Sequence, residues 1–168
     1  MPLSMYKAAI PPLVSMLANL LAILRKAESH AKGRKIDPAI LLNDRLYPDM
    51  LALMRQVQLT TDFAKGVGAR LAGIEVPKFA DTESDFAGAR ARIQKTVKFL
   101  KSLKAAQFDE AKDREIVLTI AGKPRHFTGE RYLFFFALPN FYFHMTTAYA
   151  ILRRDGVELG KRDFIGPF

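Results

Sequence analysis

The sequence predicts a single mainly α-helical domain, an antiparallel four-helix bundle with a small β-hairpin between helices three and four. Four long segments repeat apolar residues every three or four positions, the spacing of one helix face. Residues 114–127 alternate instead, with Ile116, Leu118 and Ile120 on one side and a turn at Gly122. A chain of 168 residues fits one domain, residues 1–168, that can bury its own core without a disulfide or metal.

The first helix is expected to begin after Ser4, a good N-cap residue, and to end near His30, before Gly33. Pro11 and Pro12 cannot donate backbone hydrogen bonds, so the helix should either kink there or begin its regular part there. The apolar stripe consists of Leu13, Leu17, Leu20, Leu24 and Ala27.

The apolar run from Ala8 to Leu24 raises the question of a signal peptide or membrane span. Ser15, Asn19, Ala22 and Lys26 form a less apolar stripe along one face of the same helix. A signal-peptide core would lack such a stripe, so the pattern favours an amphipathic bundle helix.

Asp37 and Pro38 are expected to cap and open a short helix that ends near Asn43, and Tyr47-Pro48 to open the second long helix. Gly73 is its predicted C-cap. Its stripe alternates steps of four and three: Met50, Met54, Val57, Thr61, Ala64, Gly68 and Leu71.

After a linker over 74–80, Asp81 or Thr82 is expected to cap the third long helix. Its predicted buried face is Phe86, Ala89, Ile93, Val97, Leu100 and Leu103.

Thr128 is the expected cap of the last helix, which should run from about Gly129 to Arg154 and stop at Gly156. It is apolar almost all round, which predicts that it is the most buried helix. The tail, residues 157–168, is expected to lie along the bundle surface.

Charge and cysteine content exclude several classes of function. The chain has no cysteine, which excludes disulfides, thiolate metal sites and cysteine nucleophiles and is compatible with the cytoplasm.

The net charge of +9 would suit nucleic acid, but the basic residues are scattered from Lys7 to Arg162. The densest set wraps around half a helix, because a spacing of three turns about 60° per step. This set is Lys95, Lys98, Lys101 and Lys104.

The candidate site lies on the last helix, where Asn140 and His144 are one turn apart on the same face. Pro139 should leave the carbonyl of Phe135 without its amide partner and so open the helix near Asn140. A buried polar pair must be satisfied by hydrogen bonds. One interpretation is a structural histidine that bonds Asn140, Thr147 or a facing helix.

The second long helix could supply a partner for His144, because it carries Gln56, Gln58 and Asp62. An aspartate that reached His144 would orient the imidazole and raise its basicity. The alternative for Asp62 is a surface acid paired with Lys65, three residues further on.

Seven short segments, spread over nearly the whole chain, share their pattern with a known family. They are Leu3–Tyr6, Lys35–Pro38, Leu46–Met50, Arg70–Gly73, Phe136–His144, Ala148–Arg153 and Gly156–Phe164. In these segments the chain resembles an uncharacterised bacterial family within the DinB/YfiT-like superfamily. The resemblance implies a DinB-like four-helix bundle, often dimeric, with no established activity.

The wider superfamily includes metal-dependent enzymes, some acting with low-molecular-weight thiols. The resemblance implies that these hold a metal with a histidine of the second helix and a His-x-x-x-His pair of the last. Here the pair reads Asn140-x-x-x-His144, and the second helix offers Gln56 or Gln58. Because amides are poor ligands for zinc or nickel, we expect a degenerate site with no metal or weakly held zinc or nickel, His144 being the one good ligand.

Three functions remain open at this point. The first is a DinB-like bundle that binds a small ligand or acts as a dimeric interaction domain, without metal catalysis. The second is a hydrolase or transferase that uses His144 with Asp62 and an unusual metal. The third is a bundle that binds nucleic acid nonspecifically. The missing histidines favour the first, and we expect a cytoplasmic homodimer with no specific nucleic-acid partner and no membrane partner.

Overall fold

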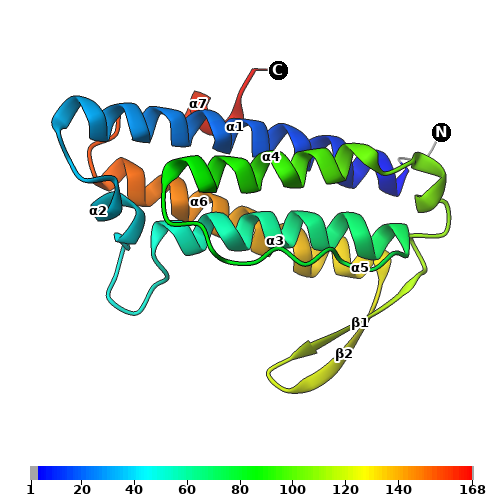
Figure 1. Cartoon of the computed structure of the whole chain (residues 1–168). Coiled ribbons are helices and arrows are strands. Elements are labelled where there is room, and N and C mark those ends of the chain that lie inside the picture. The colour runs from blue at the N-terminus through cyan, green and yellow to red at the C-terminus, as the bar shows by residue number, and fades with distance from the viewer. Residues whose placement is uncertain (1–3, 168) are drawn as a thin grey trace.

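Four long helices form the body of the protein in the computed structural model, which describes residues 4–167 (Figure 1). They are α1 (Met5–Arg34), α3 (Leu53–Ala72), α4 (Phe86–Ser102) and a last helix made of α5 (Gly129–Tyr132), a π-helical turn η2 (Leu133–Ala137) and α6 (Leu138–Arg154). The short elements are α2 (Pro38–Asn43), the 3-10 turn η1 (Ala105–Phe108), the strands β1 (Glu115–Ile120) and β2 (Lys123–Thr128), and α7 (Lys161–Ile165). The predicted bundle with a hairpin before its last long helix is therefore confirmed.

Helix α1 is longer than its sequence suggests. Ser4 caps it as predicted, its hydroxyl accepting from the Lys7 amide, and the helix runs through Pro11 and Pro12. Its end lies beyond Gly33, which is inside the helix, so the prediction of an end near His30 is wrong. The helix stops because Lys35 takes the left-handed conformation (φ 56°) and its amide caps the last turn.

Two predicted helix starts are also wrong, for local reasons. Tyr47-Pro48 lies in a turn closed by a bond from the Met50 amide to the Tyr47 carbonyl, and α3 begins only at Leu53. Asp85 caps α4 by accepting from the Gly88 amide at 2.7 Å. Asp81 and Thr82 do not cap it, and the Asp81 carboxylate is engaged by arginines instead. The predicted ends at Asn43 and Gly73 are confirmed.

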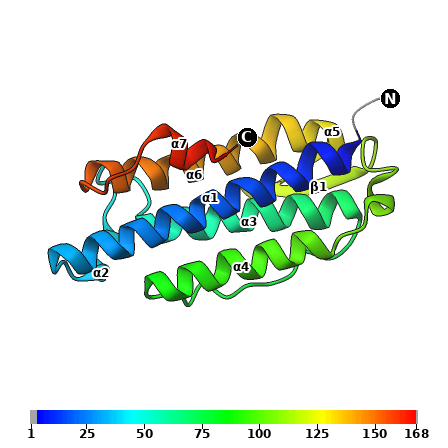
Figure 2. The same cartoon turned by 90° about the horizontal axis from the view of Figure 1, so that it is seen from above.

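The long helices pack in the order α1, α4, α3, α6 around one apolar core. Figure 2 shows α4 and α6 at opposite sides of the molecule, with α1 and α3 between them. Helices α3 and α4 run in the same direction, because residues 73–85 return along the length of the bundle as an extended segment, here called the crossover (Figures 1 and 2). The other packed neighbours, α1 with α4 and α3 with α6, are antiparallel, so the predicted antiparallel packing does not hold for α3 with α4.

The most buried long helix is α3, and the prediction for the last helix is wrong. Fourteen residues of α3 are buried. The last helix buries one side, including Tyr132, Phe141 and Met145. Its other side exposes an aromatic row, here called the aromatic face: Phe134 (44% exposed), Phe135 (71%), Tyr142 (37%) and Phe143 (56%).

The C-terminal segment lies along the bundle surface, as predicted, where it packs on α1 and covers part of the polar stripe of that helix. Asn19 is 9% exposed and donates from Nδ2 to the carbonyls of Phe164 (3.0 Å) and Ile165 (2.9 Å). Lys26 pairs with Asp163 at 2.7 Å. By length and composition α1 is able to span a membrane, and in this bundle its apolar stripe is buried in the core.

The hairpin projects from one end of the bundle (Figure 1). Its strands pair antiparallel from Glu115–Thr128 to Ile120–Lys123. The two turn residues, Ala121 (φ 49°) and Gly122 (φ 75°), both take positive φ, which matches the right-handed twist of a two-residue hairpin.

Candidate functional site

The last helix is deformed next to the predicted site. Pro139 has no amide hydrogen, and the turn before it widens so that the Leu138 amide bonds the carbonyl of Leu133, five residues back. Asn140 donates from Nδ2 to the carbonyl of Phe136 at 2.7 Å. Its side chain therefore satisfies the opened helix and makes no hydrogen bond with His144.

His144 is joined to α3 by a short relay of hydrogen bonds. Gln56, 1% exposed, donates from Nε2 to the carbonyl of Leu51 at 3.1 Å. Since that carbonyl only accepts, the amide oxygen of Gln56 must face His144, whose Nδ1 lies 2.8 Å away. Nδ1 therefore carries the proton and donates, and the lone pair of the neutral imidazole lies on Nε2.

Aromatic rings enclose the imidazole on two sides. Phe63 of α3 stacks on it with ring centroids 5.6 Å apart and planes 17° apart, and Phe143 meets it edge-on at 5.3 Å. Burial lowers the pKa of His144, and the nearby positive charge of Arg55 lowers it further. The site thus holds a neutral imidazole whose Nε2 has no hydrogen-bond partner within residues 4–167.

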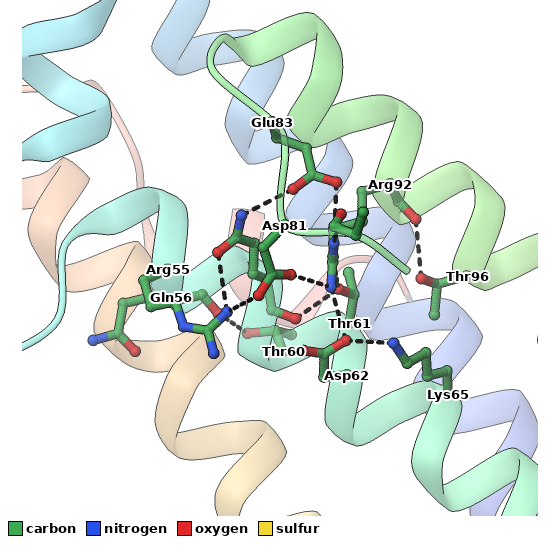
Figure 3. Close-up of polar contacts among 12 residues, drawn as sticks. Arg55, Gln56, Thr60, Thr61, Asp62, Lys65, Asp81, Glu83, Arg92 and Thr96 are labelled. Carbon is green, nitrogen blue, oxygen red and sulfur yellow. Dashed lines mark hydrogen bonds and ion pairs between the residues drawn. The ribbon is translucent and has the colours of Figure 1, made fainter. Parts of the chain in front are cut away.

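Of the three candidates from α3, Gln56 reaches His144, whereas Gln58 and Asp62 do not approach it, and Asp62 takes the alternative pairing with Lys65. Successive helix residues turn by about 100°, so Gln58 points to the opposite side from Gln56, and Asp62 lies about 120° away from it. Figure 3 shows the Gln56 amide turned away from the cluster that contains Asp62. That cluster faces α4 and the crossover.

A buried arginine, Arg92 of α4, organises this second group of polar residues. Its Nε donates to the Thr61 hydroxyl at 2.7 Å, and Nη1 donates to the carbonyl of Ala80 and to Glu83, both at 3.0 Å. Nη2 contacts the carboxylates of Asp62 at 2.8 Å and Asp81 at 3.0 Å (Figure 3). We call Arg92, Thr61, Asp62, Asp81 and Glu83 the Arg92 cluster.

The Arg92 cluster is a clamp that fastens the crossover to α3 and α4. Four of the five guanidinium N–H groups donate hydrogen bonds, and Nη2 also forms an ion pair with Asp81, so the guanidinium is committed to holding the crossover. Burial alone would raise the pKa of Glu83, but its hydrogen bonds from Gln58 and Arg92 outweigh burial and lower that pKa. Asp62 also pairs with Lys65 at 2.7 Å, the surface-type pairing that its spacing allowed.

Sequence reasoning missed the Arg92 cluster, although a signal was present. Arg92 lies between Ala89 and Ile93 on the predicted buried face of α4, and Thr96 follows one turn later. A charge at such a position requires a buried partner. The acids Asp81 and Glu83 were available in the preceding linker.

The residues around His144 do not fit a metal centre. In the part of the chain that the structure describes, no three histidine, cysteine, aspartate or glutamate side chains lie close enough to share an ion. The Gln56 oxygen is already used by Nδ1, and only Nε2 of His144 remains as a good nitrogen donor. The other two histidines lie elsewhere: His126 is exposed on the hairpin, with Nδ1 2.8 Å from Glu115, and His30 lines a cavity of about 840 Å³ beside α7.

Comparison with known proteins places this geometry in a family. The family described as "Domain of unknown function (DUF1993)" matches residues 5–165. The crystal structure of a DinB family member from Shewanella denitrificans is 40% identical, covers 97% of this chain and 92% of its own, and superposes with a TM-score of 0.92. No curated protein matches the chain. The chain folds as a DinB-like bundle and matches the family pattern from α1 to α7, and it therefore belongs to the DUF1993 family.

Proposed function

We propose that the protein binds a small aromatic ligand bearing a hydrogen-bond donor, with Nε2 of His144 as the acceptor and without metal catalysis. The observation that carries this proposal is the relay from the Leu51 carbonyl through Gln56 to Nδ1 of His144. The relay commits the proton to Nδ1 and so presents Nε2 as a lone pair in a fixed direction.

The surroundings of His144 suit such a ligand. Phe63 and Phe143 offer aromatic surface, and Phe143 is 56% exposed. A ring that packs against them gains apolar contact, while its hydroxyl or N–H group reaches Nε2.

Catalysis by a hydrolase or transferase has weaker support. An oriented neutral imidazole is able to act as a general base. The expected partner Asp62 is committed to Arg92 and Lys65, at 2.8 and 2.7 Å. No nucleophile forms a hydrogen bond with His144 within residues 4–167, so a bound ligand is the simpler use of this ring.

The test uses phenol as the probe and benzene as its matched control without a donor. Phenol should shift the ¹⁵N signal of Nε2 and raise the melting temperature, and benzene should bind at least about tenfold more weakly. His144→Phe keeps the aromatic packing but should abolish the preference for phenol. Equal binding of both probes to the wild-type protein would show that His144 is not the acceptor.

Metal content is tested on the same purified protein. We expect substoichiometric zinc or nickel or none, and His144→Ala should cost about 1–3 kcal/mol of stability because Gln56 loses a buried hydrogen-bond partner. Stoichiometric metal that disappears in His144→Ala, with unchanged stability, would support the enzyme alternative.

We further propose that the protein is a homodimer joined through Phe134, Phe135 and Tyr142 of the aromatic face, which leaves Phe143 to the ligand at His144. Four large aromatic residues lie together on one side of the last helix, and Arg131 adds a cation–π contact over Phe135 at 5.3 Å. Such a row is costly in water and is typical of an interface between subunits. Sedimentation should give a dimer that Phe135→Asp dissociates.

The matched control for the dimer is Tyr47→Asp, because Tyr47 is similarly exposed (66%) but lies outside the last helix. This variant should remain dimeric. A wild-type monomer at high micromolar concentration would contradict the proposal.

A further inference from the structure

An apolar groove runs between α1 and α4, on the side of the bundle away from the aromatic face. Its volume is about 500 Å³, and its lining is almost entirely apolar. Figure 2 shows α4 at the edge of the bundle opposite α6. The groove is formed by Ala18 and Leu21 of α1 and by Ile93, Val97, Lys98 and Lys101 of α4.

The shape of the groove suits a single chain. Its α4 side extends from Ile93 to Ser102, which corresponds to about 14 Å along the helix. A stable protein–protein interface needs about 800 Å² and 20–30 residues from each partner, far more than this groove offers. Within the described chain no aromatic residue lines it, so it provides no surface on which nucleic-acid bases stack.

The charges at the groove are of one sign. Lys98 and Lys101 line it, and no acidic residue does. Within residues 4–167 neither lysine takes part in an ion pair, whereas the buried and half-buried cations Arg92, Lys65 and Arg90 all do. Free ammonium groups beside an apolar channel complement a ligand that has an apolar chain and an anionic head.

We propose that this groove binds a single-chain anionic amphiphile, a fatty-acid carboxylate. The acyl chain lies between the two helices over Ala18, Leu21 and Val97. The carboxylate lies at the ammonium groups of Lys98 and Lys101. This site is separate from His144 and does not depend on the ligand proposed there.

The direct test is calorimetric titration of the purified protein with decanoate below its micellar concentration. Each added methylene should tighten binding by up to about fourfold from hexanoate to decanoate. Decanol, which lacks the charge, should bind at least about tenfold more weakly than decanoate. Decyltrimethylammonium should not bind. Equal affinity for all three head groups, or no dependence on chain length, would overturn the proposal.

Two pairs of variants locate the site. Ala18→Phe fills the groove and should weaken decanoate binding at least tenfold, whereas Ala22→Phe, one turn along the exposed side of α1, should not. Lys98→Gln with Lys101→Gln should remove the preference for decanoate over decanol. Lys32→Gln with Lys123→Gln changes the net charge equally and should retain it.

Further outcomes separate this site from the alternatives. His144→Phe should leave decanoate affinity unchanged, so failure of the small-ligand proposal would not affect this one. Binding to anionic phospholipid vesicles without binding of monomeric decanoate would identify a membrane surface instead and overturn the proposal. So would decanoate binding unaltered in both Ala18→Phe and the Lys98/Lys101 double variant.

Discussion

At the scale of single residues, an amide decides the chemistry of the imidazole. Gln56 has only one orientation that satisfies both neighbours, because the Leu51 carbonyl requires the amide nitrogen. The oxygen then accepts from Nδ1 of His144. A histidine in place of Gln56 would add a second nitrogen lone pair that could bind a metal. The Gln56 amide adds none, so Nε2 of His144 is the free nitrogen of this half-buried aromatic site.

The pH behaviour of His144 follows from this setting. Burial and Arg55 lower its pKa below the ordinary value of 6.5, so as the pH falls the unfolded chain takes up the proton first. Stability should therefore decrease from pH 6.5 down to the folded-state pKa and then level off. Denaturant unfolding between pH 8 and 5 should show this decrease in the free energy of unfolding. In His144→Phe the contribution of this imidazole to the decrease should be absent.

Long-range ¹H–¹⁵N spectra give an independent check on His144. At pH 7 they should show a neutral ring protonated at Nδ1, and His144→Phe assigns the signals by removing those of this ring. A charged His144 ring at pH 7, or a proton on Nε2, would contradict the relay.

At the scale of the elements, α3 serves two separate polar sites because its residues point in different directions. Gln56 and Phe63 face α6 and His144, while Thr61 and Asp62 face Arg92. The Arg92 cluster holds the crossover in place, which allows α3 and α4 to pack in parallel. A short loop could only have joined them antiparallel.

Loss of Arg92 should be expensive. The Arg92 side chain is 1% exposed and that of Glu83 is 11% exposed, so Arg92→Met leaves carboxylates without a partner. This should lower the free energy of unfolding by about 2–4 kcal/mol. The loss is smaller than for a fully buried pair because Asp62 and Asp81 are partly exposed. Arg90→Met, which breaks the more exposed pair with Glu28, should cost about 0–1 kcal/mol.

The Arg92 prediction is measured by urea unfolding of both variants. The lowered pKa of Glu83 means that its contribution is present above its unfolded value of 4.5 and is lost as the pH falls through the folded value. The gap between wild type and Arg92→Met should therefore shrink below pH 4.5. Equal losses in Arg92→Met and Arg90→Met would show that the clamp has no special role.

Two glycines should respond in opposite directions to alanine. Gly33 lies inside α1 with no atom within 4 Å of an added Cβ, so Gly33→Ala should stabilise the protein by about 0.5 kcal/mol. At Gly129 an added Cβ would clash with the Ala111 carbonyl oxygen, and Gly129→Ala should destabilise by about 2 kcal/mol or more. Thermal unfolding of the two variants decides this, and a neutral Gly129→Ala would contradict the close approach.

At the scale of the whole molecule, the net charge of +9 is divided among several faces. The four-lysine set on and after α4 illustrates this. Lys95 lies 4.1 Å from the ring of Phe79 in the crossover, while Lys98 and Lys101 line the groove towards α1. Lys104 precedes η1 at the end of the helix. Because these four lysines point in different directions, one straight ligand such as a DNA duplex cannot contact all of them at once.

Any binding to DNA should accordingly be weak and sensitive to salt. With few phosphates neutralised at once, the affinity should fall steeply between about 50 and 200 mM salt and show no sequence preference. Fluorescence anisotropy with two unrelated duplexes measures both properties. Selective binding of one duplex at physiological salt would contradict this prediction.

The sequence by itself determined the features that depend on local periodicity and caps. These include the helical stripes of α1 and α3, the helix starts at Ser4, Asp37 and Thr128, and the hairpin. It also placed Asn140 and His144 on one helix face and predicted the irregular turn at Pro139, since each follows from residues within a few positions of one another.

Tertiary structure decided which polar groups meet. Helix spacing could not choose between Gln56, Gln58 and Asp62 until the rotation of α3 against α6 was known, and that rotation depends on the packing of the whole core. Asp81 looked like a helix cap and became a partner of Arg92, because the crossover returns along the bundle. Composition suggested a last helix buried on all sides. In the structure its aromatic face has no neighbouring element among the described residues. The burial of a helix depends on what packs against it and not on its own apolarity.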